Sequence, residues 1–232
     1  MGSLASGRLR KMQLFERLKA DCQVEWKSYA EHEFVERMGD ATLPKECFQH
    51  YLIQDYLFLI QFARAHALAV YKARNLAEMR GCLEGLKAIL DTEMQLHLKL
   101  CAEWGLSAEE VEETPEAMAT IAYTRYVLEA GQAGDILDLF VALAPCMIGY
   151  AEIGERLSKM PMGQSPDNPY SVWINEYASE GYQEIAQGTK DLMDELVQTA
   201  FTEARYPRLL ELFRQATRLE ADFWTMGMDL SA

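Results

Sequence analysis

Residues 135–159 read DILDLFVALAPCMIGYAEIGERLSK, a long and mostly apolar stretch in which a proline and a cysteine stand side by side. We expect a helix with a kink or local opening at Pro145, which lacks an N–H group and whose ring crowds the carbonyl of Val141. Cys146 follows directly, and Tyr150 lies four residues later on the same helix face. A thiol beside a phenol fits a nucleophile with its hydrogen-bond partner, whereas most buried cysteines are ordinary core residues.

The composition is that of an ordinary globular protein. Of the 232 residues, 50% are hydrophobic and 25% are charged, which provides enough apolar material for a sizeable core. The net charge of −14 argues against a nucleic-acid surface, which needs a basic footprint. It disfavours binding to an anionic membrane surface for the same reason.

No segment is expected to cross a membrane or to direct secretion. The most apolar run, Ile136 to Ala151, is too short to span a bilayer and carries Asp138. Residues 1–11 are small, polar and basic, so we expect a flexible lead-in whose native origin the composition leaves open. The five cysteines form no C-x-x-C pair, which disfavours a disulfide framework or a zinc knuckle and favours the reducing cytoplasm.

Apolar residues recur at helical spacing in almost every segment, and no convincing strand or repeat is present. The richest loop signal, with three prolines and a glycine, is PMGQSPDNPY at 161–170. We therefore predict one all-α domain over residues 12–232, a helical bundle whose site lies in its own core. The expected helices span Gln13–Ala30, His32–Met38, Lys45–Lys72, Glu78–Glu103, Thr114–Gly131, Asp135–Lys159, Ser171–Gln187, Lys190–Ala204 and Tyr206–Met228.

One carboxylate stands inside the apolar stretch of the second long helix. Asp55 has Phe58 and Phe62 at positions i+3 and i+7, so one helix face combines a carboxylate with aromatic rings. Burying an aspartate is costly unless it is paired or hydrogen-bonded. Asp55 is therefore either a ligand-binding group or a structural residue bonded to a nearby tyrosine or to Arg64.

The last helix repeats this arrangement, with Phe223 and Trp224 three and four residues after Glu220. Burial there would raise the pKa of Glu220 toward the working pH and make it a proton donor, and the alternative is a surface glutamate. Three further tyrosines lie near the apolar sides of expected helices, where each alone would be a core residue with a bonded hydroxyl. They are Tyr123, Tyr150 and Tyr177.

The histidines do not form a metal-binding pattern. A di-iron bundle needs paired E-x-x-H motifs, and none of His32, His50, His66 and His97 follows a glutamate by three residues. The Glu46/His50 and Glu93/His97 pairs are four apart, as ordinary pairs on one helix face are. Glycine-rich phosphate loops and serine nucleophile elbows are also missing from the sequence.

Six motifs in order resemble the TenA / thiaminase II family over about residues 15–228. Their sequence and spacing are specific, because the apolar helix with Q-D is followed by A-Y-T, P-C-x-x-x-Y, W-I-x-x-Y and E-x-x-F-W. The motifs are YLIQDYLFLIQFARAH (51–66), EMQLHLKLCAEWGL (93–106), AYTRYVLEAG (122–131), LAPCMIGYAEIGERL (143–157), WINEYASEGY (173–182) and LEADFWTMG (219–227).

This resemblance implies a heme-oxygenase-like all-α fold without haem, assembled as a homotetramer, with no metal or organic cofactor. It implies hydrolysis of 4-amino-5-aminomethyl-2-methylpyrimidine to the 5-hydroxymethyl pyrimidine and ammonia, in thiamin salvage. Thiamin itself would be cleaved to the same pyrimidine and the thiazole. The implied partners are these small molecules, with no nucleic acid and no membrane.

The resemblance also implies a role for each candidate residue. Cys146 matches the family's nucleophile and Glu220 its acid/base, which places the chain in the cysteine-bearing branch. Asp55 matches the pyrimidine-binding carboxylate, and Phe58 stands where relatives place Tyr or Phe against the ring. Tyr123, Tyr150 and Tyr177 match the pocket tyrosines. Because a free cysteine has a pKa of about 8.5, we expect a hydrogen bond from Tyr123 or Tyr150 to assist the thiol.

Two other functions stay open at this point. A non-catalytic member of the same fold would bind the pyrimidine or act as a regulator, and the complete Cys/Glu/Asp set argues against it. A haem- or quinone-dependent oxidase on this fold would need a proximal histidine or a basic pocket. The sequence offers His32 near the first helices but no accompanying pattern.

Overall fold

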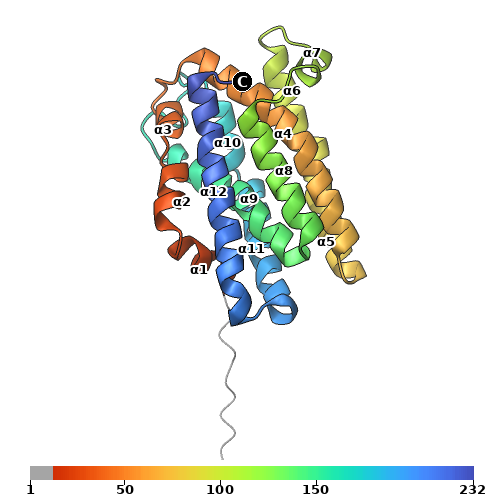
Figure 1. Cartoon of the computed structure of the whole chain (residues 1–232). Coiled ribbons are helices and arrows are strands. Elements are labelled where there is room, and N and C mark those ends of the chain that lie inside the picture. Colours follow the sequence, from red (N-terminus) through yellow and green to blue (C-terminus); the bar gives the residue numbers. More distant parts are fainter. Residues whose placement is uncertain (1–12) are drawn as a thin grey trace, which may run out of the picture.

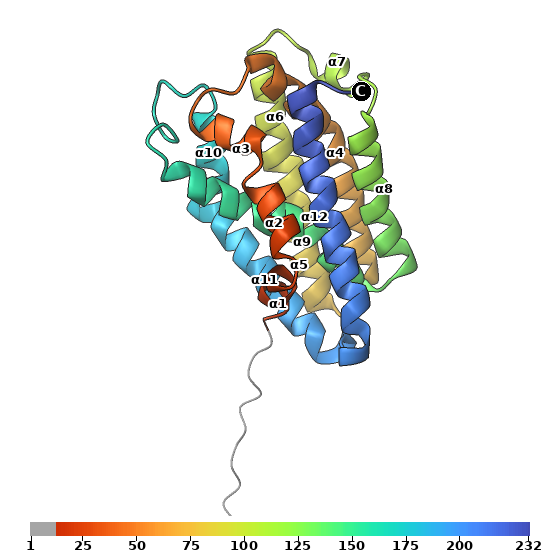
Figure 2. The same cartoon turned by 60° about the vertical axis from the view of Figure 1, so that its left-hand side comes forward.

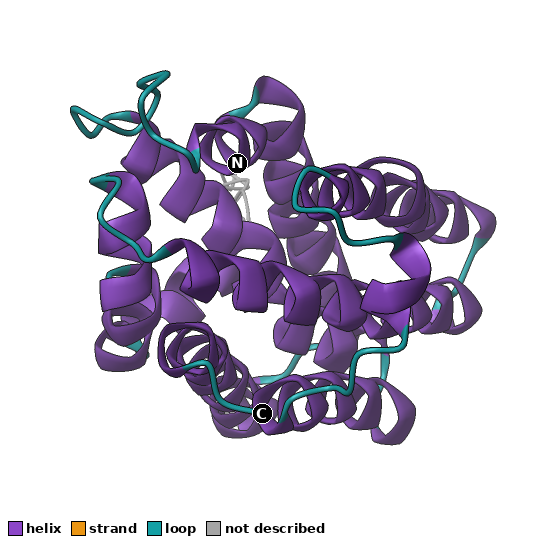
Figure 3. Cartoon of the chain, turned by 90° about the horizontal axis from the view of Figure 1, so that it is seen from above, coloured by secondary structure: helices purple, strands orange, loops and turns teal. Residues whose placement is uncertain are grey.

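The structure is a computed structural model that describes residues 13–232, and the regular elements in that range are all helices (Figure 1). Viewed from above, helices and loops account for the described chain (Figure 3). The predicted all-α class is confirmed, whereas the lead-in expected at residues 1–11 lies outside the described residues. The elements are α1 (Leu14–Ala20), α2 (Gln23–Ala30), α3 (Glu33–Gly39), α4 (Lys45–Lys72), α5 (Leu76–Ala88), the π-helical η1 (Ile89–Glu93), α6 (Met94–Ala102), α7 (Ala108–Glu112), α8 (Met118–Ala133), α9 (Ile136–Ser158), α10 (Ser171–Ala178), α11 (Glu180–Ala200), the 3₁₀ turn η2 (Glu203–Arg205) and α12 (Tyr206–Asp229).

Helix α9 is the centre of the bundle. It packs against α2, α3, α4, α8, α10, α11 and α12, and most of its residues are buried (Figures 1 and 2). Its first turn is fixed by a capping box between Asp135 and Asp138, and Arg205 makes two hydrogen bonds to Asp135. The sequence 135–159 therefore forms the core around which the other helices assemble.

The expected opening at Pro145 is absent, because α9 continues through this residue as a single helix. Helices on all sides hold it, and the Tyr29 hydroxyl donates a hydrogen bond to the Pro145 carbonyl at 3.1 Å. Helix α9 extends beyond the apolar run Ile136 to Ala151, and by length and composition alone the whole helix is long and apolar enough to cross a membrane. However, 94% of its apolar window is buried inside the bundle, as in the core helix of a globular protein.

Several predicted boundaries are wrong in the first half of the chain. The helix expected at 13–30 is divided into α1 and α2 by a turn at Asp21 and Cys22. The helix expected at 78–103 continues through the π-helical segment η1, and the short α7 was not predicted. By contrast, α4 matches the prediction, because Pro44 sets its start.

The prediction also misplaced the boundary between α10 and α11. The chain breaks at Ser179, whose hydroxyl caps α11 by accepting from the Tyr182 N–H. Gly188, taken as part of a break, lies inside α11. A single glycine weakens a helix by about 1 kcal/mol relative to alanine, and the apolar stripe of α11 on α9 overrides that preference.

A close approach of α9 to α2 requires Gly149. A Cβ at this position would lie 2.5 Å from Cε1 and 2.6 Å from the hydroxyl of Tyr29, which is fully buried between Trp26 and Trp224. We expect Gly149→Ala to lower the free energy of unfolding by about 1–3 kcal/mol, the usual cost of overpacking a core. Urea unfolding measures this change, with Gly188→Ala as the control because a Cβ there meets nothing within 4 Å. Equal stability of Gly149→Ala and wild type would show that Tyr29 is free to move.

Candidate active site

The thiol of Cys146 lies in the middle of the bundle. Helix α9 positions it, and the side chain is 8% exposed. Burial raises the pKa of the thiol well above its usual value, and the carboxylates of Glu220, Glu93 and Asp55 add to the rise. The thiol therefore lies within electrostatic range of three acidic side chains that come from three different elements.

Helix α12 brings Glu220 to this position, and the side chain is 1% exposed. The surface alternative for this residue is therefore wrong. The Tyr123 hydroxyl of α8 donates a hydrogen bond to Oε1 of Glu220 at 2.8 Å. Burial raises the pKa of Glu220 well above its usual range, with the hydrogen bond from Tyr123 opposing the rise and the charge of Asp55 adding to it. The buried position therefore favours the protonated form of Glu220.

Asp55 is buried in α4 and carries two hydrogen bonds on the same oxygen. The Tyr51 hydroxyl donates to Oδ2 at 3.0 Å, and Nε2 of His97 lies 2.7 Å from it. The alternative partner Arg64 is exposed and bonds Gln61 instead. The other carboxylate oxygen of Asp55 has no protein partner among the described hydrogen bonds, so it can accept from a ligand.

His97 is fully buried in α6 and orients Asp55. Its Nδ1 lies 2.9 Å from the Glu93 carbonyl, so the ring is held at both nitrogens. Burial alone would lower the pKa of His97, but the hydrogen bond and charge of Asp55 raise it above its usual value. The pair behaves as a buried ion pair, with an aspartate whose position is fixed before any ligand arrives.

Glu93 is the third carboxylate, at the end of the π-helical segment η1. The Tyr177 hydroxyl of α10 donates to its Oε1 at 2.8 Å. Burial raises the pKa of Glu93 to about 7, although part of the residue is exposed. π-Helical turns are rare and frequently occur at functional sites, and this one ends at Glu93, whose charge acts on the thiol.

Aromatic rings form the walls between these groups. Phe58 packs on Tyr123 at 5.0 Å between ring centroids and on Phe223 at 5.8 Å. Tyr150 packs on Tyr177 at 5.0 Å, and its hydroxyl lies 3.5 Å from that of Tyr51. Such walls stack on a flat heterocycle and exclude water, which strengthens every electrostatic interaction inside.

The expected hydrogen bond from a tyrosine to the Cys146 thiol is not found among the described residues. The Tyr123 hydroxyl is bonded to Glu220, and that of Tyr150 to Tyr51. Neither phenol is hydrogen-bonded to the thiol, so neither lowers its pKa in this way. His32, considered as a haem ligand, caps α3 through Nδ1 and contacts Thr225 through Nε2.

The seven residues singled out from the sequence are all buried in one region, and the structure adds four that were missed. Tyr51 could have been found from its position four residues before Asp55 on the same face. Glu93 and His97 were interpreted as an ordinary helix-face pair, because only the fold shows that both turn inward. Tyr182 interacts electrostatically with Glu93 and Cys146 and makes an edge-to-face contact with Tyr177.

Replacing His97 by phenylalanine is expected to lower the free energy of unfolding by about 3 kcal/mol, because it leaves Asp55 buried without its charged partner. Since the folded pKa of His97 is raised, this contribution is fully present below its unfolded pKa of about 6.5. It is lost as the pH rises through the folded value. Urea unfolding at pH 6 and pH 8 measures both effects, with His50→Phe in the partly exposed part of α4 as the control. Equal losses for both variants would contradict the pairing.

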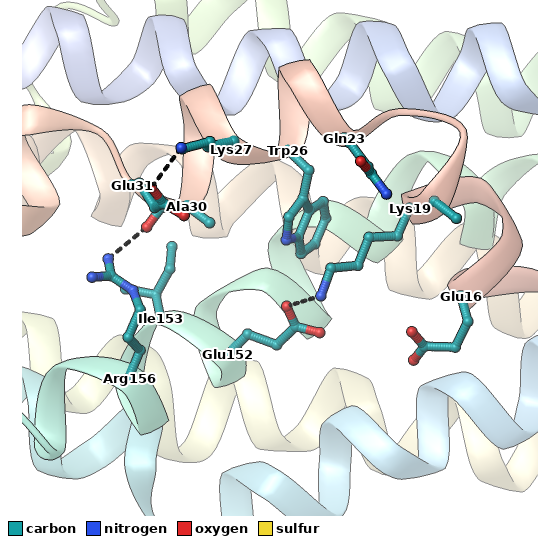
Figure 4. Close-up of a pocket in the computed structure, with 11 residues that line it drawn as sticks. Glu16, Lys19, Gln23, Trp26, Lys27, Ala30, Glu31, Glu152, Ile153 and Arg156 are labelled. Atoms are coloured by element: carbon teal, nitrogen blue, oxygen red, sulfur yellow. Dashed lines mark hydrogen bonds and ion pairs between the residues drawn. The ribbon is translucent and has the colours of Figure 1, made fainter.

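Surface cavities lie outside this cluster. One of about 470 Å³ lies between α1, α2 and α9 and is lined by Trp26 and several charged side chains (Figure 4). Its cations are engaged, because Lys19 pairs with Glu152 and Arg156 donates to the Ala30 carbonyl. This cavity contains no group suited to covalent chemistry, so the buried cluster around Cys146 is the candidate active site.

Comparisons with known proteins agree with the family resemblance found in the sequence. Residues 20–230 match the model of the TENA/THI-4/PQQC family. An aminopyrimidine aminohydrolase from Halalkalibacterium halodurans is 38% identical, over 87% of this chain and 89% of that protein.

Two solved structures are similar as a whole. A protein from Silicibacter sp. TM1040, described as a TenA family transcription regulator, is 41% identical to this chain. The two structures have a TM-score of 0.88 and match over 93% of this chain and 96% of the Silicibacter chain. A domain of unknown function with a heme oxygenase-like fold, from Shewanella denitrificans, has a TM-score of 0.73 at 15% identity. The two structures match over 93% of this chain and 92% of the Shewanella domain. At this low identity the match confirms only the predicted fold class.

Proposed function

The chain belongs to the TENA/THI-4/PQQC family, and from this membership and the buried cluster we propose that it is an aminopyrimidine aminohydrolase of thiamin salvage. It converts 4-amino-5-aminomethyl-2-methylpyrimidine and water to the 5-hydroxymethyl pyrimidine and ammonia. The relative from Halalkalibacterium halodurans, named for this activity, supports the reaction type. The observation that carries the proposal is a buried thiol surrounded by three carboxylates and aromatic walls.

The charge of the site fits this substrate. The aminomethyl group is an ammonium at neutral pH, and the carboxylates of Asp55 and Glu93 provide acidic partners for a cation in this buried region. The amidine edge of the pyrimidine donates to the oxygen of Asp55 that His97 and Tyr51 leave accessible. Phe58 and Tyr150 stack on the two faces of the ring.

The proposed reaction begins with proton transfers. Glu220, protonated in the free enzyme, gives its proton to a ring nitrogen, which makes the ring electron-poor. The carboxylate so formed accepts the proton of the Cys146 thiol as the sulfur adds to the ring carbon next to the one that bears the CH₂ group. The S–C bond forms, and the ring loses its aromaticity.

The adduct then releases ammonia. The electron pair of the ring nitrogen moves toward the CH₂ group, the C–N bond breaks, and an exocyclic methylene remains on a cationic ring. The released ammonia takes up the proton of Glu220 and departs as ammonium. Water adds to the methylene and gives a proton to the Glu220 carboxylate so formed. The thiolate leaves and takes up the proton of the ring nitrogen, and the ring regains its aromaticity. Thiamin would follow the same course with the thiazole as the leaving group.

We also propose a cytoplasmic homotetramer, as the family resemblance implies. Its support within this chain is a row of exposed apolar side chains on α5 and η1, suited to burial against another subunit. These are Leu76, Met79, Leu83 and Leu90. Light scattering of the purified protein tests the assembly, and a monomer at micromolar concentration would contradict it.

Ammonia release from the aminomethyl pyrimidine tests the proposed function, with thiamin as the second substrate. We expect multiple turnovers on the pyrimidine at neutral pH. Tight binding of the pyrimidine without ammonia release would instead indicate a binding or regulatory protein; the Silicibacter relative is described as a transcription regulator. Absence of both binding and turnover would overturn the assignment.

A further inference from the structure

A second cavity lies between α5 and α11, away from the cluster around Cys146. Phe140 and Met147 of α9 form its floor, and His66 of α4 lies in its wall. The volume is about 520 Å³, within the range of sites that hold small molecules. Exposed residues of both helices, including Gly81 and Gly188, surround its mouth, so solvent reaches the cavity.

His66 presents an unused hydrogen-bond acceptor here. The side chain is 1% exposed, and its Nδ1 lies 3.1 Å from the Phe62 carbonyl, which requires the proton on Nδ1. Nε2 therefore carries a lone pair, and it has no hydrogen-bond partner among the described residues. Burial lowers the pKa of His66 to about 4, so the ring stays neutral at pH 7.

The wall opposite His66 is a glycine. A Cβ at Gly85 would lie 3.1 Å from Cδ2 and 3.5 Å from Nε2 of His66, so a side chain at this position would press against the ring edge. A buried acceptor without a partner costs about 1–3 kcal/mol. The combination of an orphaned acceptor with an adjoining space indicates a place for a donor group.

The rest of the lining selects against anions. Glu78, Glu84, Asp191 and Glu195 contribute carboxylates, of which Glu78 pairs with Arg74 and Glu84 with Lys87. The lining itself contains no lysine or arginine from the described part of the chain. The apolar surface comes from Phe140, Met147, Ile185 and Leu192. A molecule with a phosphate or carboxylate group would be repelled, whereas an apolar body would be well covered.

We propose that this cavity is a second small-molecule site, which takes a neutral or cationic compound with an apolar body and a hydroxyl or amino group that donates to Nε2 of His66. The proposal does not depend on the aminohydrolase reaction, because it uses none of the side chains around Cys146. The ligand class is that of small aromatic or aliphatic alcohols and amines.

Four probes of similar size test the class: 2-phenylethanol, 2-phenylethylamine, phenylacetate and ethylbenzene. Binding is followed by protein NMR titration of the full chain. We expect the alcohol and the amine to bind, the alcohol about fivefold more tightly than ethylbenzene because of one hydrogen bond, and phenylacetate more weakly than the alcohol. Equal binding of the alcohol and ethylbenzene, or preferred binding of phenylacetate, would overturn the proposal.

Substitutions in and near the cavity test whether the probes bind there. Gly188→Leu places a side chain at the mouth, where a Cβ meets nothing within 4 Å, and is expected to weaken binding of all probes at least about tenfold by filling the space. Gly181→Leu is the matched control on α11, equally open but outside the lining, and should bind like wild type. His66→Phe should remove the advantage of 2-phenylethanol over ethylbenzene.

The folded state of each variant is checked by circular dichroism before titration. Because Gly188 is exposed, its variant keeps the test decisive even where His66→Phe fails to fold. Binding of 2-phenylethanol that survives Gly188→Leu would show that the probe occupies another place, and the proposed site would be rejected.

Discussion

Replacing Cys146 by serine is expected to lower ammonia release from the aminomethyl pyrimidine by at least about a thousandfold while the fold survives. A serine hydroxyl is far less acidic and less nucleophilic than a thiol, so it cannot form the ring adduct at a useful rate. Steady-state ammonia release by the wild type and the variant measures the loss. Circular dichroism and urea unfolding check the fold, because the substitution is nearly isosteric.

The environment of Cys146 sharpens this prediction. Activated cysteines normally lie near positive groups that lower the pKa of the thiol, whereas burial and three carboxylates raise it here. The free enzyme therefore holds a protonated thiol, and a cationic substrate must arrive before the thiolate forms. We expect iodoacetamide to alkylate Cys146 slowly at pH 7 in the free protein.

Cys101→Ser is the matched control. Cys101 is fully buried and burial raises the pKa of its thiol to about 11, but it lies in α6 and belongs to no acidic cluster. Its variant should keep wild-type turnover. Near-normal turnover by Cys146→Ser would exclude the covalent adduct and leave a direct attack of water on the substrate.

Much of the fold could be predicted from local sequence. Helix α4 begins after Pro44 and ends at Lys72 as expected, because its signals lie within a few residues of its ends. The boundary near Ser179 was misplaced because tertiary packing carries α11 through Gly188. The π-helical segment could not be predicted, since one inserted residue in a turn leaves no periodic signal over five residues.

The candidate active site was likewise only partly predictable from the sequence. The family motifs directed attention to Cys146, Glu220 and Asp55, and the structure places all three in one buried region. Their roles remain predictions. The contact between His97 and Asp55 spans 42 residues, and no single-sequence pattern reports which of two helix faces turns inward. The same limit explains why the thiol was expected to accept help from a tyrosine that is bonded elsewhere.

Replacing Glu220 by glutamine is expected to lower turnover by about 10²–10⁴-fold, because glutamine can accept the hydrogen bond from Tyr123 but cannot exchange a proton. The substitution keeps the shape of the side chain and removes only its titration. The ratio kcat/KM is measured with the aminomethyl pyrimidine between pH 6 and pH 9. If Glu220 carries a proton in the reaction, a small buffer acid added to the Glu220→Gln variant should restore part of the activity.

The same variant is expected to become more stable than the wild type as the pH rises. In the wild type the folded pKa of Glu220 is raised by burial, so the folded state binds more protons than the unfolded state above pH 4.5, its usual value. Wild-type stability therefore falls as the pH increases from 4.5 toward the folded pKa, by at most about 1.4 kcal/mol per pH unit from this group. Glutamine has no charge to bury, so Glu220→Gln escapes this loss.

Urea unfolding at pH 5, 7 and 9 measures the difference between Glu220→Gln and the wild type. We expect the difference to grow in favour of the variant while its activity stays low, which is how a buried catalytic carboxylate lowers stability. Asp222→Asn, two residues along α12, is the control and should show no such pH dependence, because Asp222 is exposed. A constant difference across the three pH values would mean that Glu220 is ionised in the folded protein, and it could not then supply the first proton.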